Sequence, residues 1–266
     1  MPRRSLGKTR RLVVKVGTGT LTDASGRFDR RNCERLAAEL AALAATRSVV
    51  LVSSGAIALG ADRLGLVRSP RKSWDIATKQ AAAAVGQPDL MAEWGRALGA
   101  RGRLVAQVLL TADDLASRKR FLNARHTFEA LLERGVVPVV NENDTVAVDE
   151  IRVGDNDSLA ALVATCVGAD LVAMLTDVEG LYDRDPRHPA ARLVGDVARI
   201  TSEVERMAGG AGSERSVGGM ATKLAAAKRL GAQGVGTALL SGRRAGAMEA
   251  LLAGEPVGTF FRPGAE

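Results

Sequence analysis

Histidine and cysteine are scarce in this chain of 266 residues, which holds two of each. Cys33 and Cys166 provide neither a disulfide framework nor a cysteine-based zinc site, and they fit a reducing compartment. His126 and His188 are too few for a zinc hydrolase, a metalloprotease or a Ser-His-Asp hydrolase. We therefore expect chemistry that proceeds without imidazole.

Aromatic residues and long apolar runs are also lacking. Only 3% of the residues are aromatic, which argues against a base-stacking surface and predicts a core of Val, Leu, Ile and Ala. No apolar run reaches the roughly 18 residues of a membrane span, and residues 1–11 lack an apolar segment of signal-peptide length. We expect a cytoplasmic protein in which the Arg-rich start, ahead of residue 11, is a short solvated tail.

The net charge of +7 allows two interpretations, an affinity for nucleic acid or an attraction for anionic small molecules such as nucleotide phosphates. Of the 37 basic residues only seven are lysine, and the arginines are dispersed along the chain. A nucleic-acid-binding surface would concentrate them in a stripe. The pattern favours a solvated Arg-rich surface.

Apolar, β-rich runs alternate with Ala- and Leu-rich helical stretches along the chain. Strands are expected at residues 12–16, 49–52, 104–110, 136–140, 171–175 and 235–240, and helices at 30–45, 76–98, 123–133, 159–167 and 220–230. This alternation predicts an α/β fold, a three-layer αβα sandwich around a mainly parallel open sheet. We expect residues 1–266 to form a single domain, with a weak division near residue 170.

Two strand ends carry residues suited to phosphate. Lys15-Val16-Gly17-Thr18-Gly19-Thr20 closes the first strand, and there glycines allow amides to approach anionic oxygens while the lysine supplies charge. The alternative is a turn with an edge lysine. Val52-Ser53-Ser54-Gly55-Ala56-Ile57 leads from a strand into a helix, whose amino terminus suits an anion. Its alternative is an N-capping serine without a ligand.

Amides and carboxylates gather after the fourth strand, in Asn141-Glu142-Asn143-Asp144 and Gly154-Asp155-Asn156-Asp157-Ser158. Carboxylates accept hydrogen bonds from an ammonium group, and Asn side chains bind either an ammonium or a carboxylate. These segments therefore suit an amino acid. Turn formation with N-capping is the alternative, and it is less plausible for both segments together.

Thr176-Asp177 ends a further strand, and Ser216-Val217-Gly218-Gly219-Met220-Ala221-Thr222-Lys223 is a glycine loop that enters a helix. The loop is not a Walker A motif, because Lys223 follows Thr222 where that motif requires glycine. A different phosphate-binding family is indicated.

Taken together, these segments resemble the amino acid kinase family, and within it most closely the branch that phosphorylates free glutamate. The resemblance covers about residues 11 to 262 and follows the family's order. It rests on Lys15-Val16-Gly17-Thr18, Ser54-Gly55-Ala56-Ile57, Lys79-Gln80-Ala81, Ala84-Val85-Gly86-Gln87, Phe121-Leu122-Asn123-Ala124-Arg125, Asn141-Glu142-Asn143-Asp144, Val153-Gly154-Asp155-Asn156-Asp157, Leu175-Thr176-Asp177 and Gly218-Gly219-Met220-Ala221-Thr222-Lys223.

The resemblance implies transfer of a phosphoryl group from ATP, with Mg²⁺, to the γ-carboxylate of L-glutamate, the first step of proline biosynthesis. It implies catalytic roles for Lys15, Lys223 and Asp157, with the aspartate organising the lysines. It places glutamate at Ser54, Asp144 and Asn156. The nucleotide is expected at Lys15, Thr176, Asp177, Val217, Gly218, Gly219, Met220, Ala221, Thr222 and Lys223.

Further expectations follow from the same resemblance. The lobe at about residues 11–170 is expected to bind the amino acid and the lobe at about 171–262 the nucleotide. Proline is expected to act as a feedback inhibitor, a homo-oligomer to form, and the product to pass to a glutamyl phosphate reductase. An attacking carboxylate is ionised at neutral pH and needs no general base, which agrees with the scarcity of histidine.

The sequence departs from the family pattern in two ways. Many members carry a carboxyl-terminal PUA domain, and we expect none here. Val217 stands where the family usually has threonine in its Gly-Thr-Gly-Gly loop, which removes a hydroxyl near the nucleotide.

Other readings remain. Acetylglutamate kinase, aspartokinase and uridylate kinase share the fold and its two lysines, and the Asn-Glu-Asn-Asp and Gly-Asp-Asn-Asp segments argue against them. A non-catalytic amino-acid sensor is disfavoured by the presence of Lys15, Asp157 and Lys223. An RNA-binding module is disfavoured by the lack of aromatic platforms.

Overall fold

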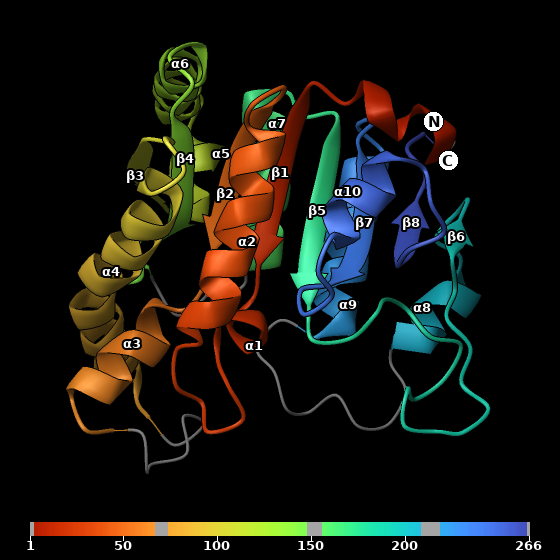
Figure 1. Cartoon of the computed structure of the whole chain (residues 1–266), viewed down its shortest axis with the longest axis horizontal. Coiled ribbons are helices and arrows are strands. Elements are labelled where there is room, and N and C mark those ends of the chain that lie inside the picture. Colours follow the sequence, from red (N-terminus) through yellow and green to blue (C-terminus); the bar gives the residue numbers. More distant parts are fainter. Residues whose placement is uncertain (1–2, 67–73, 148–155, 209–218, 265–266) are drawn as a thin grey trace.

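A computed structural model describes residues 3–66, 74–147, 156–208 and 219–264. Strands in these residues form one eight-stranded sheet in the order β3-β4-β2-β1-β5-β7-β8-β6 (Figure 1). Every pair of neighbouring strands is parallel except β7 and β8. The predicted mainly parallel α/β fold is therefore confirmed.

The long strands form where the sequence has short apolar runs. They are β1 (Arg11–Val16), β2 (Ser48–Ser53), β3 (Val105–Leu110), β4 (Val137–Glu142), β5 (Leu171–Thr176) and β7 (Gly236–Ser241). Five of these, β1, β2, β4, β5 and β7, lie between two strands, and strands that are covered on both faces are mostly apolar. The predicted strands are confirmed, whereas the short β6 (Asp196–Val197) and β8 (Thr259–Phe261) were not predicted.

Helices cover both faces of the sheet, as predicted. They are η1 (Arg3–Lys8), α1 (Thr18–Leu21), α2 (Arg30–Leu43), α3 (Ala56–Arg63), α4 (Ile76–Gly99), α5 (Ala112–Ala116), α6 (Arg118–Glu133), α7 (Asn156–Val167), α8 (Ser202–Ala208), α9 (Met220–Gly231) and α10 (Ala247–Leu252). None of the helices described is long and apolar enough to span a membrane.

Alternate residues of β1 point into two separate cores. Leu12 and Val14 belong to the core beneath α2, α4 and α10, and Val13 belongs to the core beneath α7 and α9. In Figure 1, α2 and α10 lie in front of the sheet and α7 lies behind it. The two cores produce the predicted three-layer sandwich, because side chains of successive strand residues point to opposite faces.

The start of the chain was predicted to be a solvated tail, and this prediction is wrong. Residues Arg3–Lys8 form the short 3₁₀ helix η1, in which Leu6 is fully buried. The Arg3 guanidinium donates hydrogen bonds to the carbonyl oxygens of Glu255, Val257 and Gly258 and pairs with Asp196. A guanidinium that is satisfied in this way can be buried, which charge alone does not reveal.

The strands that precede residue 170 lie on one side of the β1–β5 contact, and β5 and the strands after it lie on the other. All belong to one continuous sheet. The assignment of the amino acid to the first half and the nucleotide to the second remains a prediction.

Candidate active site

Two buried lysines flank one buried aspartate. Lys15 Nζ lies 2.6 Å from Asp157 Oδ1, and Lys223 Nζ lies 3.1 Å from Asp157 Oδ2. Asp157 is fully buried, and the lysines are 5% and 6% exposed. The structure therefore brings together three residues that are 66 or more positions apart along the chain, in the arrangement that the resemblance implied.

The fold explains how these residues meet. Lys15 lies near the carboxyl end of β1, while Asp157 and Lys223 lie in the first turns of α7 and α9. Parallel α/β sheets gather ligand-binding residues at the carboxyl ends of their strands. The first turn of α7 also favours a negative charge, because the positive end of the helix dipole lies there.

The lysines determine the charge state of the aspartate. Burial raises the pKa of Asp157, but the nearby charges of Lys15 and Lys223, with hydrogen bonds from Lys15 and Thr222, outweigh it and lower the pKa below its ordinary value. Thr222 Oγ1 lies 2.8 Å from Asp157 Oδ2. Asp157 is thus an anion that holds two ammonium groups side by side, and together the three side chains carry a charge of +1.

A network of hydrogen-bonded polar side chains, buried except for the half-buried Ser54, lies among the residues predicted to bind glutamate. Asn156 Nδ2 donates to Ser54 Oγ at 2.7 Å and to Asn141 Oδ1 at 3.0 Å, and Asn141 Nδ2 donates to Gln87 Oε1 at 2.9 Å. The structure joins Ser54 to Asn156, two of the residues predicted to bind glutamate. Gln87 and Asn141 were recognised only as parts of motifs and not as site residues.

Within this network of side chains, two buried atoms have no hydrogen-bond partner among the described residues, namely Asn156 Oδ1 and Gln87 Nε2. A buried polar atom without a partner is costly, so such atoms point to a missing ligand or water. Asn156 Oδ1 can accept from an ammonium group, and Gln87 Nε2 can donate to a carboxylate. The pair therefore suits an amino acid.

Asp144 lies in the turn after β4 and is buried, as is Glu142. Burial, assisted by the charge of Glu142, raises the pKa of Asp144 to about 7. No contact between Asp144 and the Ser54–Asn156 pair is seen among the described residues. A cation between the two carboxylates would favour ionisation of Asp144.

The residues predicted to bind the nucleotide are described in part. Thr176 Oγ1 donates to Asp177 Oδ1 at 3.0 Å, and a Cβ on Gly19 would lie 3.8 Å from the Asp177 carboxylate, so the ends of β1 and β5 lie side by side. Gly219 is the N-cap residue of α9, which Met220, Ala221, Thr222 and Lys223 begin. Val217 and Gly218 lie outside the described residues.

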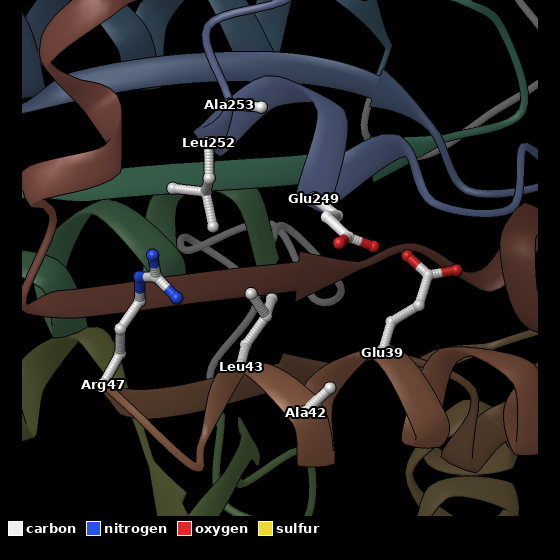
Figure 2. Close-up of a pocket in the computed structure, with 7 residues that line it drawn as sticks. All are labelled: Glu39, Ala42, Leu43, Arg47, Glu249, Leu252 and Ala253. Carbon is white, nitrogen blue, oxygen red and sulfur yellow. The ribbon is translucent and has the colours of Figure 1, made fainter.

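A pocket of about 380 Å³ opens between α2 and α10 and does not include any predicted site residue. Figure 2 shows Arg47 and the carboxylates of Glu39 and Glu249 around it. The candidate active site is therefore identified by its chemistry and not by the size of this pocket.

Within the parts of the chain that the structure describes, no group of three or more His, Cys, Asp or Glu side chains is placed to hold a metal ion. The Asp157 carboxylate is engaged by two ammonium groups. The ammonium groups of Lys15 and Lys223 suit phosphate oxygens, because lysines provide compact positive charges.

The mainly parallel αβα sandwich and the two-lysine site agree with the family resemblance seen in the sequence, and comparison with family profiles gives the same result. A profile of the Amino acid kinase family matches residues 10–240. The chain belongs to that family.

Two individual relatives with named activities are similar to nearly the whole of this chain. The chain is 74% identical over 265 residues to the glutamate 5-kinase of Anaeromyxobacter dehalogenans, covering 100% of this chain and 70% of the relative. It is 52% identical over 260 residues to the glutamate 5-kinase of Syntrophotalea carbinolica, covering 97% and 69%. Carbamate kinase from Giardia lamblia has the same fold, with a TM-score of 0.67, 18% identity and coverage of 97% and 99%.

Proposed function

We propose that this protein transfers the γ-phosphoryl group of ATP to the γ-carboxylate of L-glutamate, forming L-glutamyl 5-phosphate and ADP for proline biosynthesis. The observation that carries the proposal is the buried Lys15–Asp157–Lys223 group. It is supported by the identity of 74% to a glutamate 5-kinase along the whole of this chain.

The proposed reaction is a direct transfer. A γ-carboxylate oxygen of glutamate attacks the γ-phosphorus of ATP, the bond from that phosphorus to the bridging oxygen breaks, and ADP leaves with the electron pair. Because the carboxylate is ionised at neutral pH, no base is required. Lys15 and Lys223 stabilise the charge that is redistributed over the phosphoryl oxygens, and Asp157 keeps both ammonium groups in place.

The proposed glutamate site uses Ser54, Asn156 and Asp144. Asn156 Oδ1, which has no partner among the described residues, accepts from the substrate ammonium, and ionised Asp144 supplies the opposite charge. The nucleotide is proposed to bind at Thr176 and Asp177 and at the amino terminus of α9. These assignments place the two substrates on opposite halves of the sheet.

The proposal includes magnesium as a part of the ATP substrate. Magnesium ions prefer oxygen ligands and keep several waters, so ATP phosphates are sufficient to carry the ion into a site with few carboxylates. When bound, the ion would neutralise phosphate charge. The residues of this chain bind, orient and stabilise the reacting groups.

Regulation and partners belong to the proposal as well. Proline retains an α-carboxylate and a secondary ammonium but lacks a γ-carboxylate, so it can occupy the glutamate site without reacting. We propose competitive inhibition by proline, a homo-oligomeric cytoplasmic enzyme, and delivery of the product to a reductase. Initial rates against glutamate at several proline concentrations would show a raised KM with an unchanged maximal rate.

The decisive experiment measures ADP release with glutamate, aspartate, N-acetylglutamate or UMP as acceptor, with hydroxylamine added to trap an acyl phosphate. The expected result is glutamyl hydroxamate that forms only with glutamate and ATP. Release of ADP with another acceptor alone would replace the proposed substrate. Absence of acceptor-dependent ADP release in a folded protein would support the sensor interpretation instead.

A further inference from the structure

A one-turn helix follows the strand that carries Lys15. Helix α1 contains four residues, Thr18–Leu21, and so short a helix is not stable alone because helix nucleation is unfavourable. Gly17 lies directly against the lysine, since a Cβ at Gly17 would lie 3.5 Å from Lys15 Nζ. Residues 17–22, which we term the α1 turn, therefore border this ammonium group on the side of Gly17.

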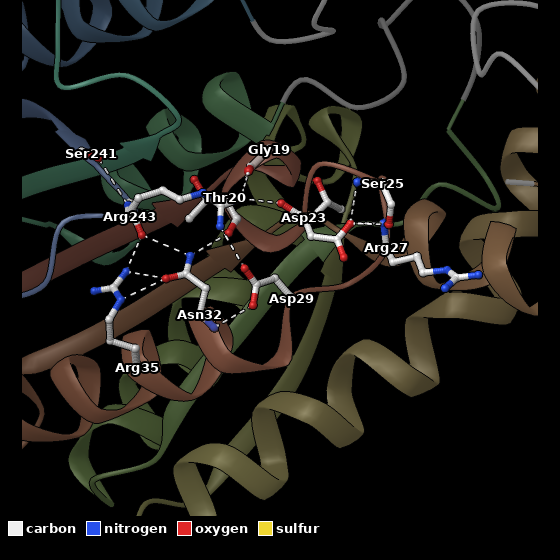
Figure 3. Close-up of polar contacts among 12 residues, drawn as sticks. Gly19, Thr20, Asp23, Ser25, Arg27, Asp29, Asn32, Arg35, Ser241 and Arg243 are labelled. Carbon is white, nitrogen blue, oxygen red and sulfur yellow. Dashed lines mark hydrogen bonds and ion pairs between the residues drawn. The ribbon is translucent and has the colours of Figure 1, made fainter.

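Every backbone carbonyl of the α1 turn has a hydrogen-bond partner. Gly17 O accepts from Thr20 N and Leu21 N, Thr18 O from Thr22 Oγ1, Gly19 O from Arg243 Nη2, Thr20 O from Asn32 Nδ2, Leu21 O from Asp29 N, and Thr22 O from Arg243 Nη2. Arg243 and Asn32 thus cap, from outside the turn, carbonyls that a short helix leaves unpaired. Figure 3 shows both side chains beside it.

The Arg243 guanidinium is also anchored to Asp29, at the start of α2. Its Nη1 atom lies 2.9 Å from Asp29 Oδ2, while Asp29 Oδ1 accepts from Asn32 N at 3.0 Å and so caps α2. The Arg243 Nη2 atom reaches Gly19 O at 3.1 Å. One guanidinium therefore links the loop after β7, the start of α2 and the α1 turn, a connection that its fixed fork of donors allows.

Gly242, which precedes Arg243, connects the α1 turn to Thr176, a predicted nucleotide-binding residue at the end of β5. Gly242 N donates to Thr176 O at 2.7 Å, and Asn32 Nδ2 donates to Gly242 O at 3.2 Å. A Cβ at Gly242 would lie only 2.4 Å from Thr20 Cγ2. The backbone after β7 therefore packs closely against Thr20 of the α1 turn, with no room for a side chain between them.

From these contacts we propose that Arg243 is a positioning residue for phosphoryl transfer, which holds the α1 turn against β7 so that Lys15 keeps a fixed separation from Thr176 and Asp177, where the nucleotide is proposed to bind. This inference rests on the proposed function. Arg243 touches backbone and Asp29 rather than a substrate. Its effect should appear in the rate of transfer, because in-line transfer is sensitive to displacements of about 1 Å.

The test compares Arg243→Ala and Arg243→Lys with Arg244→Ala, which alters the exposed neighbouring arginine. Arg243→Ala should lower kcat by about 10- to 100-fold while KM for glutamate stays within about twofold. Arg243→Lys should give an intermediate kcat, because an ammonium can pair with Asp29 but lacks the forked donors. Added guanidinium chloride, at concentrations that leave the wild type folded, should partly restore Arg243→Ala. Arg244→Ala should behave as the wild type.

Three results would overturn the inference: wild-type kcat in Arg243→Ala and Arg243→Lys, an equal loss in Arg244→Ala, or a change confined to KM. If Arg243→Ala does not fold, Arg243→Lys decides the question by the same criterion. A wild-type protein that lacks glutamate-dependent turnover would instead contradict the proposed function, so the two failures are distinguishable.

Discussion

At the scale of single residues, Lys223 and Lys228 provide a matched pair on α9. Lys223 is buried against Asp157, whereas Lys228 is exposed and pairs with Glu205. Lys223→Ala should lower kcat by about 100-fold with a much smaller change in KM for glutamate, because its charge is needed most where phosphoryl charge is redistributed. Steady-state kinetics of both alanine variants provide the measurement. A change in KM alone would remove Lys223 from the transfer step.

The raised pKa of Asp144, about 7, predicts how glutamate binding depends on pH. Below this pKa the carboxyl is neutral and does not attract the ammonium of the substrate, and above it the carboxylate is ionised. KM for glutamate should therefore fall as pH rises from about 6 to about 8. Asp144→Asn should have a high KM without this pH dependence, while Asp113→Asn, at an exposed position of α5, should retain it.

The same pKa has the opposite consequence for stability. Between the unfolded value of 3.8 and about 7, the folded protein holds a proton at Asp144 that the unfolded chain has released. Stability contributed by this group is therefore lost as pH rises through that interval. Asp144→Asn should raise Tm at about pH 8 although it weakens glutamate binding. A lower Tm would show that the carboxylate has a structural role instead.

At the scale of elements, α3 and α4 are in backbone contact through two glycines. A Cβ at Gly86 would lie 1.9 Å from Ala56 O, and a Cβ at Gly60 would lie 1.7 Å from Ala82 O. Gln87, which follows Gly86, is hydrogen-bonded through Asn141 to Asn156. Ser54, which also contacts Asn156, lies just before α3. The crossing of these helices therefore sets the geometry of the proposed glutamate site.

Gly86→Ala should force the two helices apart. We expect a loss of about 1 to 3 kcal/mol in the free energy of unfolding, the usual cost of overpacking, together with a higher KM for glutamate. Gly99→Ala is the control on the same helix, because a Cβ there meets nothing within 4 Å, and it should be neutral or slightly stabilising. Denaturant unfolding and kinetics of both variants test this, and equal stabilities would contradict it.

Sequence patterns predicted the long elements because a strand buried on both faces is a continuous apolar run. β6 and β8 contain two and three residues, too few to show a pattern. Lys15, Asp157 and Lys223 were predictable because each stands at a strand end or helix start within a recognised motif. Gln87 and Arg243 were not, because Gln87 was recognised only as part of a motif without a role, Arg243 lies outside every recognised motif, and only the folded chain shows their contacts with Asn141 and Gly19.

At the scale of the whole molecule, the first residues secure the edge of the sheet formed by β8 and β6. Arg3 is 9% exposed and its guanidinium binds carbonyls on both sides of Val257. The same group lies 5.9 Å from the centre of the Phe260 ring. Figure 1 shows both ends of the chain at the opposite end of the strands from α1.

Arg3→Met should therefore lower stability without affecting catalysis. Loss of the guanidinium leaves buried carbonyls without donors, which costs about 2 to 4 kcal/mol in total, and Tm should fall while kcat and KM at moderate temperature stay at wild-type values. Lys8→Met, at an exposed position of the same short helix η1, should leave Tm nearly unchanged. If Arg3→Met kept the wild-type Tm, the hydrogen bonds of Arg3 would not stabilise this edge of the sheet. If kcat fell along with Tm in Arg3→Met, this edge of the sheet would be coupled to the Lys15 site, and the separation between a stabilising end and a catalytic end of the strands would be wrong.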